Sequence, residues 1–231
     1  MAMQAITKRV KVLEVMKLYS YYRSSASYRV RIALALKGIR YEYIAVNLAK
    51  GENRSADFLA LSGNGLVPLL VTKGQPIGQS LAIIEYLDEL HQFPALLPVC
   101  ATARALARAI AQSIACEIHP LNNLRVLRYL ESILQHEDAE KTSWYHHWTR
   151  TGLETVEHQL RQAYEVHQGR FSFGKLPGLV DCVLVPQIYN ARRFNVSLQG
   201  LQRILDIEVA CQQLSAFALA APENCPDCPE M

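Results

Sequence analysis

The first ninety or so residues of the chain carry hydrophobic patterns that switch between the period of a strand and the period of a helix. Short apolar or alternating runs predict strands, and apolar residues three and four positions apart predict helices. The predicted strands cover 18–22, 41–46, 68–72 and 76–77, and the predicted helices cover 25–36, 53–61 and 80–90. Parallel strands need a crossover helix between them, so the order β-α-β-α-β-β-α predicts a mixed sheet covered by helices.

After residue 100 nearly all of the periodicity is helical. Helices are predicted over 101–136, with a kink at Pro120, and over 141–167, 180–190 and 202–220. The fold class is therefore α/β plus all-α. We expect an N-terminal extension at 1–16 that is disordered, an α/β domain at 17–92, a linker at 93–100, an all-helical domain at 101–222 and a tail at 223–231.

Composition narrows the classes of partner. The net charge is only +3, without a dense basic stripe, so no nucleic acid is expected. No stretch approaches the ~18 apolar residues of a membrane span, and the charged N-terminus has no secretory pattern. We therefore expect a cytoplasmic protein.

The six cysteines are scattered, and Cys225 and Cys228 lie in a proline-rich tail rather than between a strand and a helix, which favours an incidental pair. His146-His147 has no further ligand at metal spacing, so no metal is expected.

Two helix starts in the α/β half carry hydroxyl groups. Arg23-Ser24-Ser25 joins the first strand to the first helix, and Gln79-Ser80 opens the third helix. Free backbone N–H groups and the helix dipole favour an anion at such a place, including a thiolate. A serine there is also the ordinary N-cap of a helix, and both interpretations stay open. Between these two helix starts in the sequence, Val67-Pro68 stands at the beginning of a predicted strand.

Polar residues also gather in the helical half. His119, Asn122 and Asn123 share one arc beside the Pro120 kink, with Arg125 at its border, which indicates either the wall of a cleft or a polar helix face at a bend. Arg192-Arg193 ends a later helix. Arginines there complement the helix dipole, or bind a carboxylate with two hydrogen bonds.

These motifs together resemble the zeta class of the glutathione transferases. The resemblance rests on 24–38 (SSASYRVRIALALKG), Val67-Pro68, 79–87 (QSLAIIEYL), 119–123 (HPLNN) and 184–194 (LVPQIYNARRF), in the family order and over roughly 17–222. Within this family the chain is most similar to bacterial maleylacetoacetate isomerases and maleylpyruvate isomerases.

The resemblance implies a thioredoxin-like N-terminal domain, an all-helical C-terminal domain and a homodimer. It implies that glutathione is the cofactor. Ser24 or Ser25 would hydrogen-bond its thiolate, and the backbone of Val67, followed by a cis Pro68, would contact its cysteinyl part. Gln79 and Ser80 would hold its γ-glutamyl end.

It further implies a small dianionic maleyl substrate, isomerised from cis to trans by reversible thiolate addition. The arginines that bind the substrate in relatives are matched here by Arg23, Arg125 and Arg193, and Arg23 is also a catalytic candidate. Polar residues of the same cleft are matched by His119 and Asn123. Maleylacetoacetate is the first substrate candidate and maleylpyruvate the second. A general transferase or dehalogenase of small α-halo acids, and a glutathione-binding protein without catalysis, are the remaining alternatives.

Three positions depart from the family pattern. Ala26 stands where many relatives have cysteine, Ser62-Gly63 replaces an Asn-Pro turn, and Gly178 replaces a Ser or Thr helix cap. At the last position we expect Asp181 to bond the turn instead.

Overall fold

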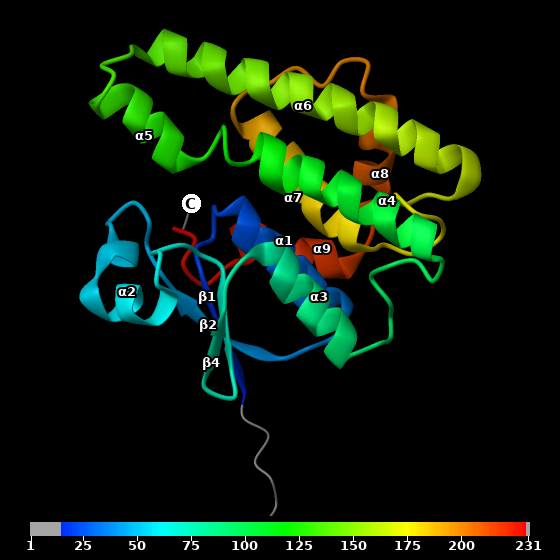
Figure 1. Cartoon of the computed structure of the whole chain (residues 1–231), viewed down its shortest axis with the longest axis horizontal. Helices are drawn as coiled ribbons and strands as arrows, with labels where there is room; N and C mark the ends of the chain where they lie inside the picture. Colours follow the sequence, from blue (N-terminus) through cyan, green and yellow to red (C-terminus); the bar gives the residue numbers. More distant parts are fainter. Residues whose placement is uncertain (1–14, 230–231) are drawn as a thin grey trace, which may run out of the picture.

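A mixed sheet lies at one end of the computed structural model, which describes residues 15–229 (Figure 1). Its strand order is β2-β1-β3-β4, with β2 parallel to β1 and the other two pairs antiparallel. The strands in the described part of the chain are β1 (Met16–Ser20), β2 (Tyr41–Ala45), β3 (Leu69–Thr72) and β4 (Gln75–Ile77). The predicted mixed sheet and its element order are confirmed. The first strand lies two residues earlier than predicted, so Tyr21 and Tyr22 belong to the turn.

Both faces of this sheet are covered by helices. Along β3, Leu70 lies in the core beneath α1 (Ser25–Leu36) and α3 (Ser80–Leu90), whereas its neighbour Leu69 packs with Phe58 of α2 (Ala56–Ser62) on the other face. This alternation follows from the two-residue period of a strand. Helices α1 and α3 have the bounds that the sequence predicted.

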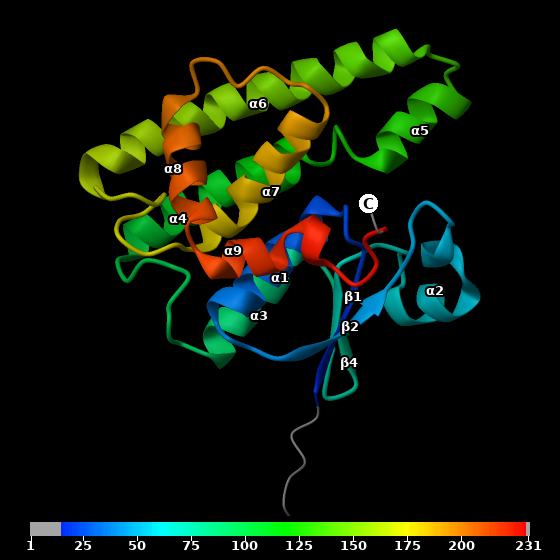
Figure 2. The ribbon, with the colours of Figure 1, turned by 180° about the vertical axis from the view of Figure 1, so that it is seen from behind.

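The second half is helical, as predicted. Its long helices are α4 (Ala101–Gln112), α5 (Leu124–Ser132), α6 (Asp138–Val166), α7 (Leu179–Arg193) and α8 (Gln202–Gln212), followed by the short α9 (Ser215–Ala220). Helix α7 is buried along most of its length, and α1 packs against both α7 and α9. One apolar core therefore runs from the sheet into the helical half, which Figures 1 and 2 show above the sheet.

Two predicted helices are interrupted. The helix predicted over 101–136 ends in a π-helical turn, Ser113–Ile118, and restarts only after Asn123. Pro120 cannot donate a helical hydrogen bond, and the Asn123 side chain accepts from the backbone N–H of Arg125, so a new helix begins there. The helix predicted over 202–220 is divided at Leu214, whose backbone is extended (φ −99°, ψ 128°).

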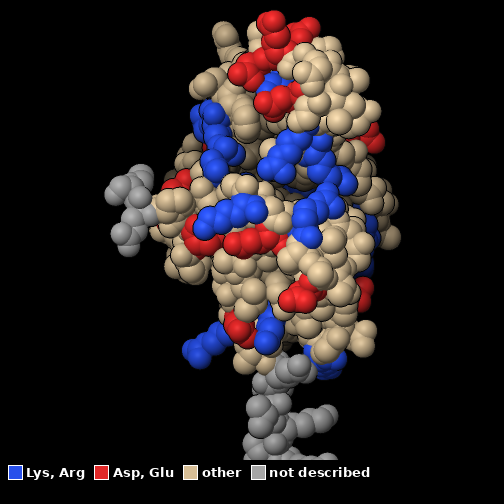
Figure 3. Space-filling view, turned by 90° about the vertical axis from the view of Figure 1, so that its left-hand side faces the viewer, with Lys and Arg blue, Asp and Glu red and all other residues tan. Residues whose placement is uncertain are grey.

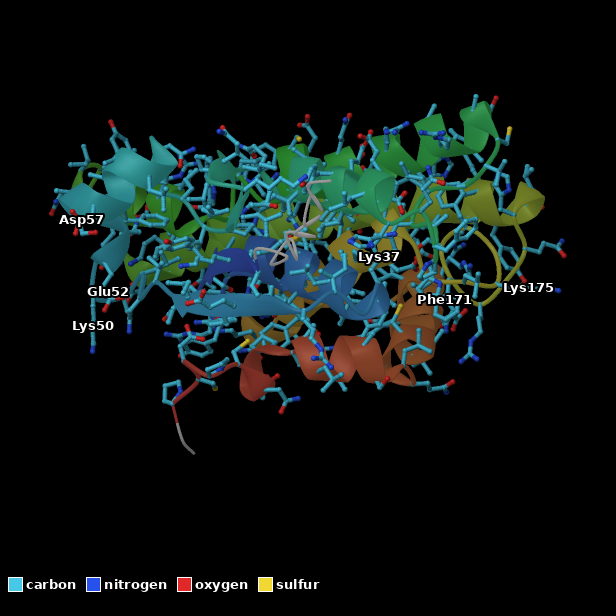
Figure 4. All side chains as sticks on the ribbon, turned by 90° about the horizontal axis from the view of Figure 1, so that it is seen from below. Lys37, Lys50, Glu52, Asp57, Phe171 and Lys175 are labelled. Atoms are coloured by element: carbon cyan, nitrogen blue, oxygen red, sulfur yellow. The ribbon has the colours of Figure 1, made fainter. Side chains whose placement is uncertain are left out.

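The junction between the halves is fixed by polar contacts. The Lys37 ammonium, labelled in Figure 4, lies 2.8 Å from an oxygen of Asp88 and donates to the backbone carbonyls of His91 and Pro94. At the start of α7 the Gly178 N–H donates to the Asp181 carboxylate over 2.7 Å, as predicted for this glycine cap. The Lys37 contacts hold the linker against the ends of α1 and α3.

The C-terminal tail docks on the sheet domain. The Asp227 carboxylate accepts hydrogen bonds from the Tyr22 N–H (3.0 Å) and the Tyr43 hydroxyl (2.6 Å). Both ribbon views place this end of the chain between α2 and α5, near the turn after β1 (Figures 1 and 2). The predicted extension at 1–16 falls mainly outside the described residues, and β1 already begins at Met16. Within residues 15–229, no helix combines the length and the apolarity needed to cross a membrane.

Candidate active site

A cavity lies where α1, the start of β3, the start of α3 and the π-helical turn meet. Several of the predicted site residues line it, namely Val67, Pro68, Gln79, Ser80 and His119. Its other lining residues include Ala26, Arg29, Asn64 and Cys116. The cavity therefore joins segments from both halves of the molecule.

The two serines at the start of α1 have different partners. Ser24 is the N-cap: its oxygen accepts from the Ser27 N–H over 3.2 Å, which is the ordinary structural role. Ser25 is buried, and its hydroxyl lies 3.2 Å from the imidazole Nδ1 of His119, across the boundary between the halves. Only Ser25 is thus connected to a residue that lines the cavity.

The direction of the bond between His119 and Ser25 follows from the capping of α5. The Asn123 Oδ1 accepts from the Arg125 N–H over 3.0 Å, so the other end of the amide, Nδ2, faces His119 Nε2 at 3.2 Å and donates to it. His119 Nε2 is then an acceptor, which places the imidazole proton on Nδ1 and makes Nδ1 donate to Ser25. The Ser25 oxygen accepts this bond, and its own proton is free for another acceptor.

His119 stays neutral in this chain of hydrogen bonds. Burial, together with the positive charges of Arg29 and Arg125, lowers its pKa to about 3. A protonated imidazole would donate at both nitrogens and conflict with the Asn123 amide. The tautomer that orients Ser25 is therefore the state of His119 throughout the neutral range.

The second predicted anion site lies at the start of α3. Ser80 is buried, and its hydroxyl oxygen accepts from Arg29 Nη1 over 3.2 Å. Gln79, directly before the helix, has a left-handed backbone (φ 65°) and an exposed side chain. The Val67-Pro68 peptide bond is cis, as the resemblance implied.

The three predicted arginines do not line the cavity, but two of them lie near one tyrosine. Arg23 and Arg193 both act electrostatically on Tyr189, whose pKa is raised to about 12 mainly by burial and by its hydrogen bond to Glu223. Arg125 lies close enough to His119 to affect its pKa. All three side chains are exposed. Basic side chains gather near the middle of the face in Figure 3.

Arg29 and Cys116 also line the cavity, although the sequence patterns did not single them out. Arg29 lies one helical turn after Ser25 and Ala26, so the spacing alone places it on the same face of α1. Cys116 precedes His119 by three residues and shares its side of the chain. The helical period could have identified both residues once the serines were taken as a site.

Comparison with known proteins agrees with the architecture. The N-terminal domain of glutathione S-transferases matches residues 14–89. A maleylpyruvate isomerase of Ralstonia is 46% identical over 212 residues, which are 92% of this chain and 99% of that protein. A maleylacetoacetate isomerase of Pseudomonas aeruginosa is 45% identical over 217 residues, covering 93% of this chain and 99% of that protein.

Solved structures show the same relation. A maleyl pyruvate isomerase described as a bacterial zeta-class glutathione transferase superposes with a TM-score of 0.89, at 45% identity, over 92% of this chain and all of that chain. The maleylacetoacetate isomerase of Anaeromyxobacter dehalogenans with bound glutathione superposes with a TM-score of 0.83, at 39% identity, over 93% of this chain and 98% of that chain. The chain therefore belongs to the zeta class of the glutathione transferases.

Proposed function

We propose that the protein is a glutathione-dependent cis–trans isomerase that converts maleylacetoacetate to fumarylacetoacetate, with maleylpyruvate as the alternative substrate. The observation that supports this proposal is the series of hydrogen bonds from Asn123 through His119 to Ser25. These bonds leave the hydroxyl proton of Ser25 free to bind an anion at the start of α1. The relatives at about 45% identity are named for these two isomerisations.

The residues of the cavity fit glutathione. Glutathione is a tripeptide with two carboxylates and a thiol. The cavity presents the N-termini of two helices and the buried guanidinium of Arg29, which are groups that bind anions. The Nε and Nη2 atoms of Arg29 have no hydrogen-bond partner among residues 15–229. Val67, Pro68, Gln79 and Ser80 would hold its backbone and γ-glutamyl end, and Ser24 caps the helix that carries Ser25.

When bound, glutathione supplies a thiolate that adds reversibly to the conjugated double bond and so permits rotation about it. The Ser25 hydroxyl would donate a hydrogen bond to the sulfur, keep its own proton, and so stabilise the ionised thiol. Arg23, Arg125 and Arg193 hold the substrate carboxylates and stabilise the negative charge that develops during addition. In this scheme His119 and Asn123 orient the hydroxyl of Ser25.

The test follows the absorbance of maleylacetoacetate and maleylpyruvate with purified protein, with and without glutathione. We expect loss of the maleyl absorbance that requires glutathione, and the faster of the two substrates identifies the reaction. Unchanged absorbance of both, with glutathione still bound, would contradict catalysis.

Adjacent arginines provide a matched pair of variants. Arg192 is paired with the Glu208 carboxylate (2.9 Å from Nε), whereas no ion pair forms at Arg193 among the described residues. Arg193→Ala should lower kcat/KM by about 10- to 100-fold, because a carboxylate loses hydrogen bonds worth about 1.5–3 kcal/mol. Arg192→Ala should reduce stability and leave kcat/KM unchanged. The opposite outcome would contradict the assignment of Arg193.

The homodimer and the cytoplasmic location stay predictions. Sedimentation of the purified protein would test the first, and fractionation of the cells that make it would test the second.

A further inference from the structure

Two free cysteines, Cys225 and Cys228, lie in a tight turn of the docked C-terminal tail. The Cys228 N–H donates to the Cys225 carbonyl over 3.0 Å, with Pro226 and Asp227 between them. A turn of this kind brings its first and fourth Cα atoms within about 7 Å, and the Cα atoms of a disulfide usually lie about 4.4–6.8 Å apart. Sequence context alone favours an incidental pair, but the turn brings the two residues to a separation at which a disulfide can form.

The two thiols differ in their surroundings. Cys225 is 7% exposed, and its Sγ donates to the Ala221 carbonyl over 3.5 Å. Burial raises the pKa of the Cys225 thiol. Cys228 is partly exposed. Thiol–disulfide exchange needs access to the attacking thiol, so Cys228 is the thiol that meets an oxidant from solution first.

The residue between the cysteines connects the tail to the sheet domain. Within residues 15–229, the side-chain hydrogen bonds from 222–229 to that domain both end on the Asp227 carboxylate, which accepts from the Tyr22 N–H and the Tyr43 hydroxyl. Earlier in the tail, the Glu223 carboxylate accepts from the Tyr189 hydroxyl of α7 over 2.7 Å. The tail therefore joins the helical half to the turn after β1, directly before the first arginine that the proposed function assigns to the substrate.

The base of the tail is anchored independently of the cysteines. Arg31 is buried, and its Nε donates to the Ala220 carbonyl over 2.9 Å, while its Nη2 donates to the Tyr22 carbonyl over 3.1 Å. The start of the tail and the turn after β1 thus share one buried cation. The part of the tail that can open is the segment after this anchor, and the cysteine turn lies in that segment (Figures 1 and 2).

We propose that Cys225 and Cys228 form a reversible disulfide that locks the turn of the tail and so holds Asp227 on the turn after β1. This modification site goes beyond the proposed function and does not depend on it. Because the tail lies against Tyr22, the redox state of the pair controls how firmly the turn after β1 is held.

Glutathione disulfide is the oxidant in this reaction. The Cys228 sulfur, having lost its proton, attacks one sulfur of the oxidant, so a mixed disulfide forms and one glutathione leaves as its thiolate. The Cys225 sulfur, likewise deprotonated, then attacks the Cys228 sulfur and displaces the second glutathione. The protein gives up two protons and two electrons, and the oxidant takes them up as two molecules of glutathione.

A redox titration of the full chain tests whether the disulfide forms. The protein is equilibrated with mixtures of glutathione and glutathione disulfide, its free thiols are blocked with iodoacetamide, and its peptides are weighed by mass spectrometry. We expect Cys225 and Cys228 to lose alkylation together, in a peptide that is lighter by two hydrogen atoms than its reduced form. Exposed Cys100 and Cys116 should form only adducts with glutathione.

Hydrogen exchange tests the effect on the turn. The Tyr22 N–H should exchange about tenfold more slowly in the oxidised than in the reduced wild type, because closing a loop restricts the freedom of the open tail. Cys228→Ser is the control: it should exchange like the reduced wild type, with or without glutathione disulfide. If this variant fails to fold, Cys225→Ser takes its place, since its hydroxyl can still donate to the Ala221 carbonyl.

Three results would overturn the proposal. The first is a tail that stays reduced, or carries only glutathione adducts, under excess glutathione disulfide. The second is a disulfide that leaves the exchange of the Tyr22 N–H unchanged. The third is equal slowing of this exchange in Cys228→Ser, which would show that the pair is not its cause. None of these measurements uses a maleyl substrate, so this inference and the proposed function can fail separately.

Discussion

Replacing each of the two adjacent serines at the start of α1 by alanine should produce different defects. Ser24→Ala removes the N-cap, whose oxygen accepts from the Ser27 N–H, and should cost about 0.5–2 kcal/mol of unfolding free energy. Ser25→Ala removes the hydroxyl that we assign to the thiolate. A hydrogen bond to a charged group is worth about 1.5–3 kcal/mol, which raises the pKa of the bound thiol by about one to two units at 1.36 kcal/mol per unit.

Two measurements distinguish these defects. The ultraviolet absorbance of the thiolate, followed against pH in the complex with glutathione, gives the pKa of the bound thiol. Urea unfolding without glutathione gives the stability. Ser25→Ala also leaves the His119 Nδ1–H without its acceptor, so both variants lose stability, and the thiol pKa is the decisive quantity.

A control variant completes the test. Ser24→Asn keeps an N-cap oxygen, so it should retain both the stability and the thiol pKa of the wild type. The assignment of Ser25 would be refuted if Ser24→Ala raised the thiol pKa and Ser25→Ala left it unchanged.

Further predictions concern three other places. Folding lowers the pKa of His119, so the contribution of the neutral ring to stability is complete above the unfolded pKa of about 6.5 and is lost as the pH falls below that value. NMR should show a neutral ring that carries its proton on Nδ1 from about pH 5 to 8. Protonation of the folded ring in that interval would contradict this prediction. S-methylglutathione should slow the alkylation of Cys116, which lines the cavity, but not of exposed Cys100, as peptide mass spectrometry can measure. Asp227→Ala should lower the unfolding free energy by about 1–3 kcal/mol in urea, because Tyr22 and Tyr43 lose a charged acceptor; unchanged stability would show that the tail does not support the turn.

Local patterns predicted most of the fold but little of the site geometry. The bounds of α1 and α3 follow from hydrophobic spacing and from serines at their starts, which are interactions within one turn. The bond between Ser25 and His119 joins residues 94 positions apart, and no local pattern contains it. Docking of Asp227 on Tyr22, over 205 positions, is of the same kind. The resemblance to a family indicated that His119 and Asn123 belong to the same cleft. The direction of the hydrogen bonds that link them to Ser25 could be derived only from the structure.

The error at 101–136 shows how the site depends on a break in secondary structure. Hydrophobic spacing favours one long helix there, but the helix ends in the π-helical turn and a new one starts after Asn123. A continuous helix would use the Arg125 N–H for a backbone bond, and Asn123 would have no capping role to orient its amide. The break at Pro120 therefore fixes the Asn123 amide, which fixes the tautomer of His119 and the direction of the Ser25 hydroxyl.

Ser80, which lines the cavity, and Ser25, which is hydrogen-bonded to the cavity residue His119, share one physical device. A hydroxyl group can rotate, so a serine at a helix start donates to an anion only part of the time unless another donor occupies its oxygen. His119 does this for Ser25 and Arg29 does it for Ser80, and both donors are held by the fold before any ligand binds. Such preorganised donors need no reorientation when the negative charge arrives, which is the condition under which hydrogen bonds stabilise a thiolate or a carboxylate most strongly. Variants at His119 and Arg29 should therefore weaken anion binding even where they leave the serines in place.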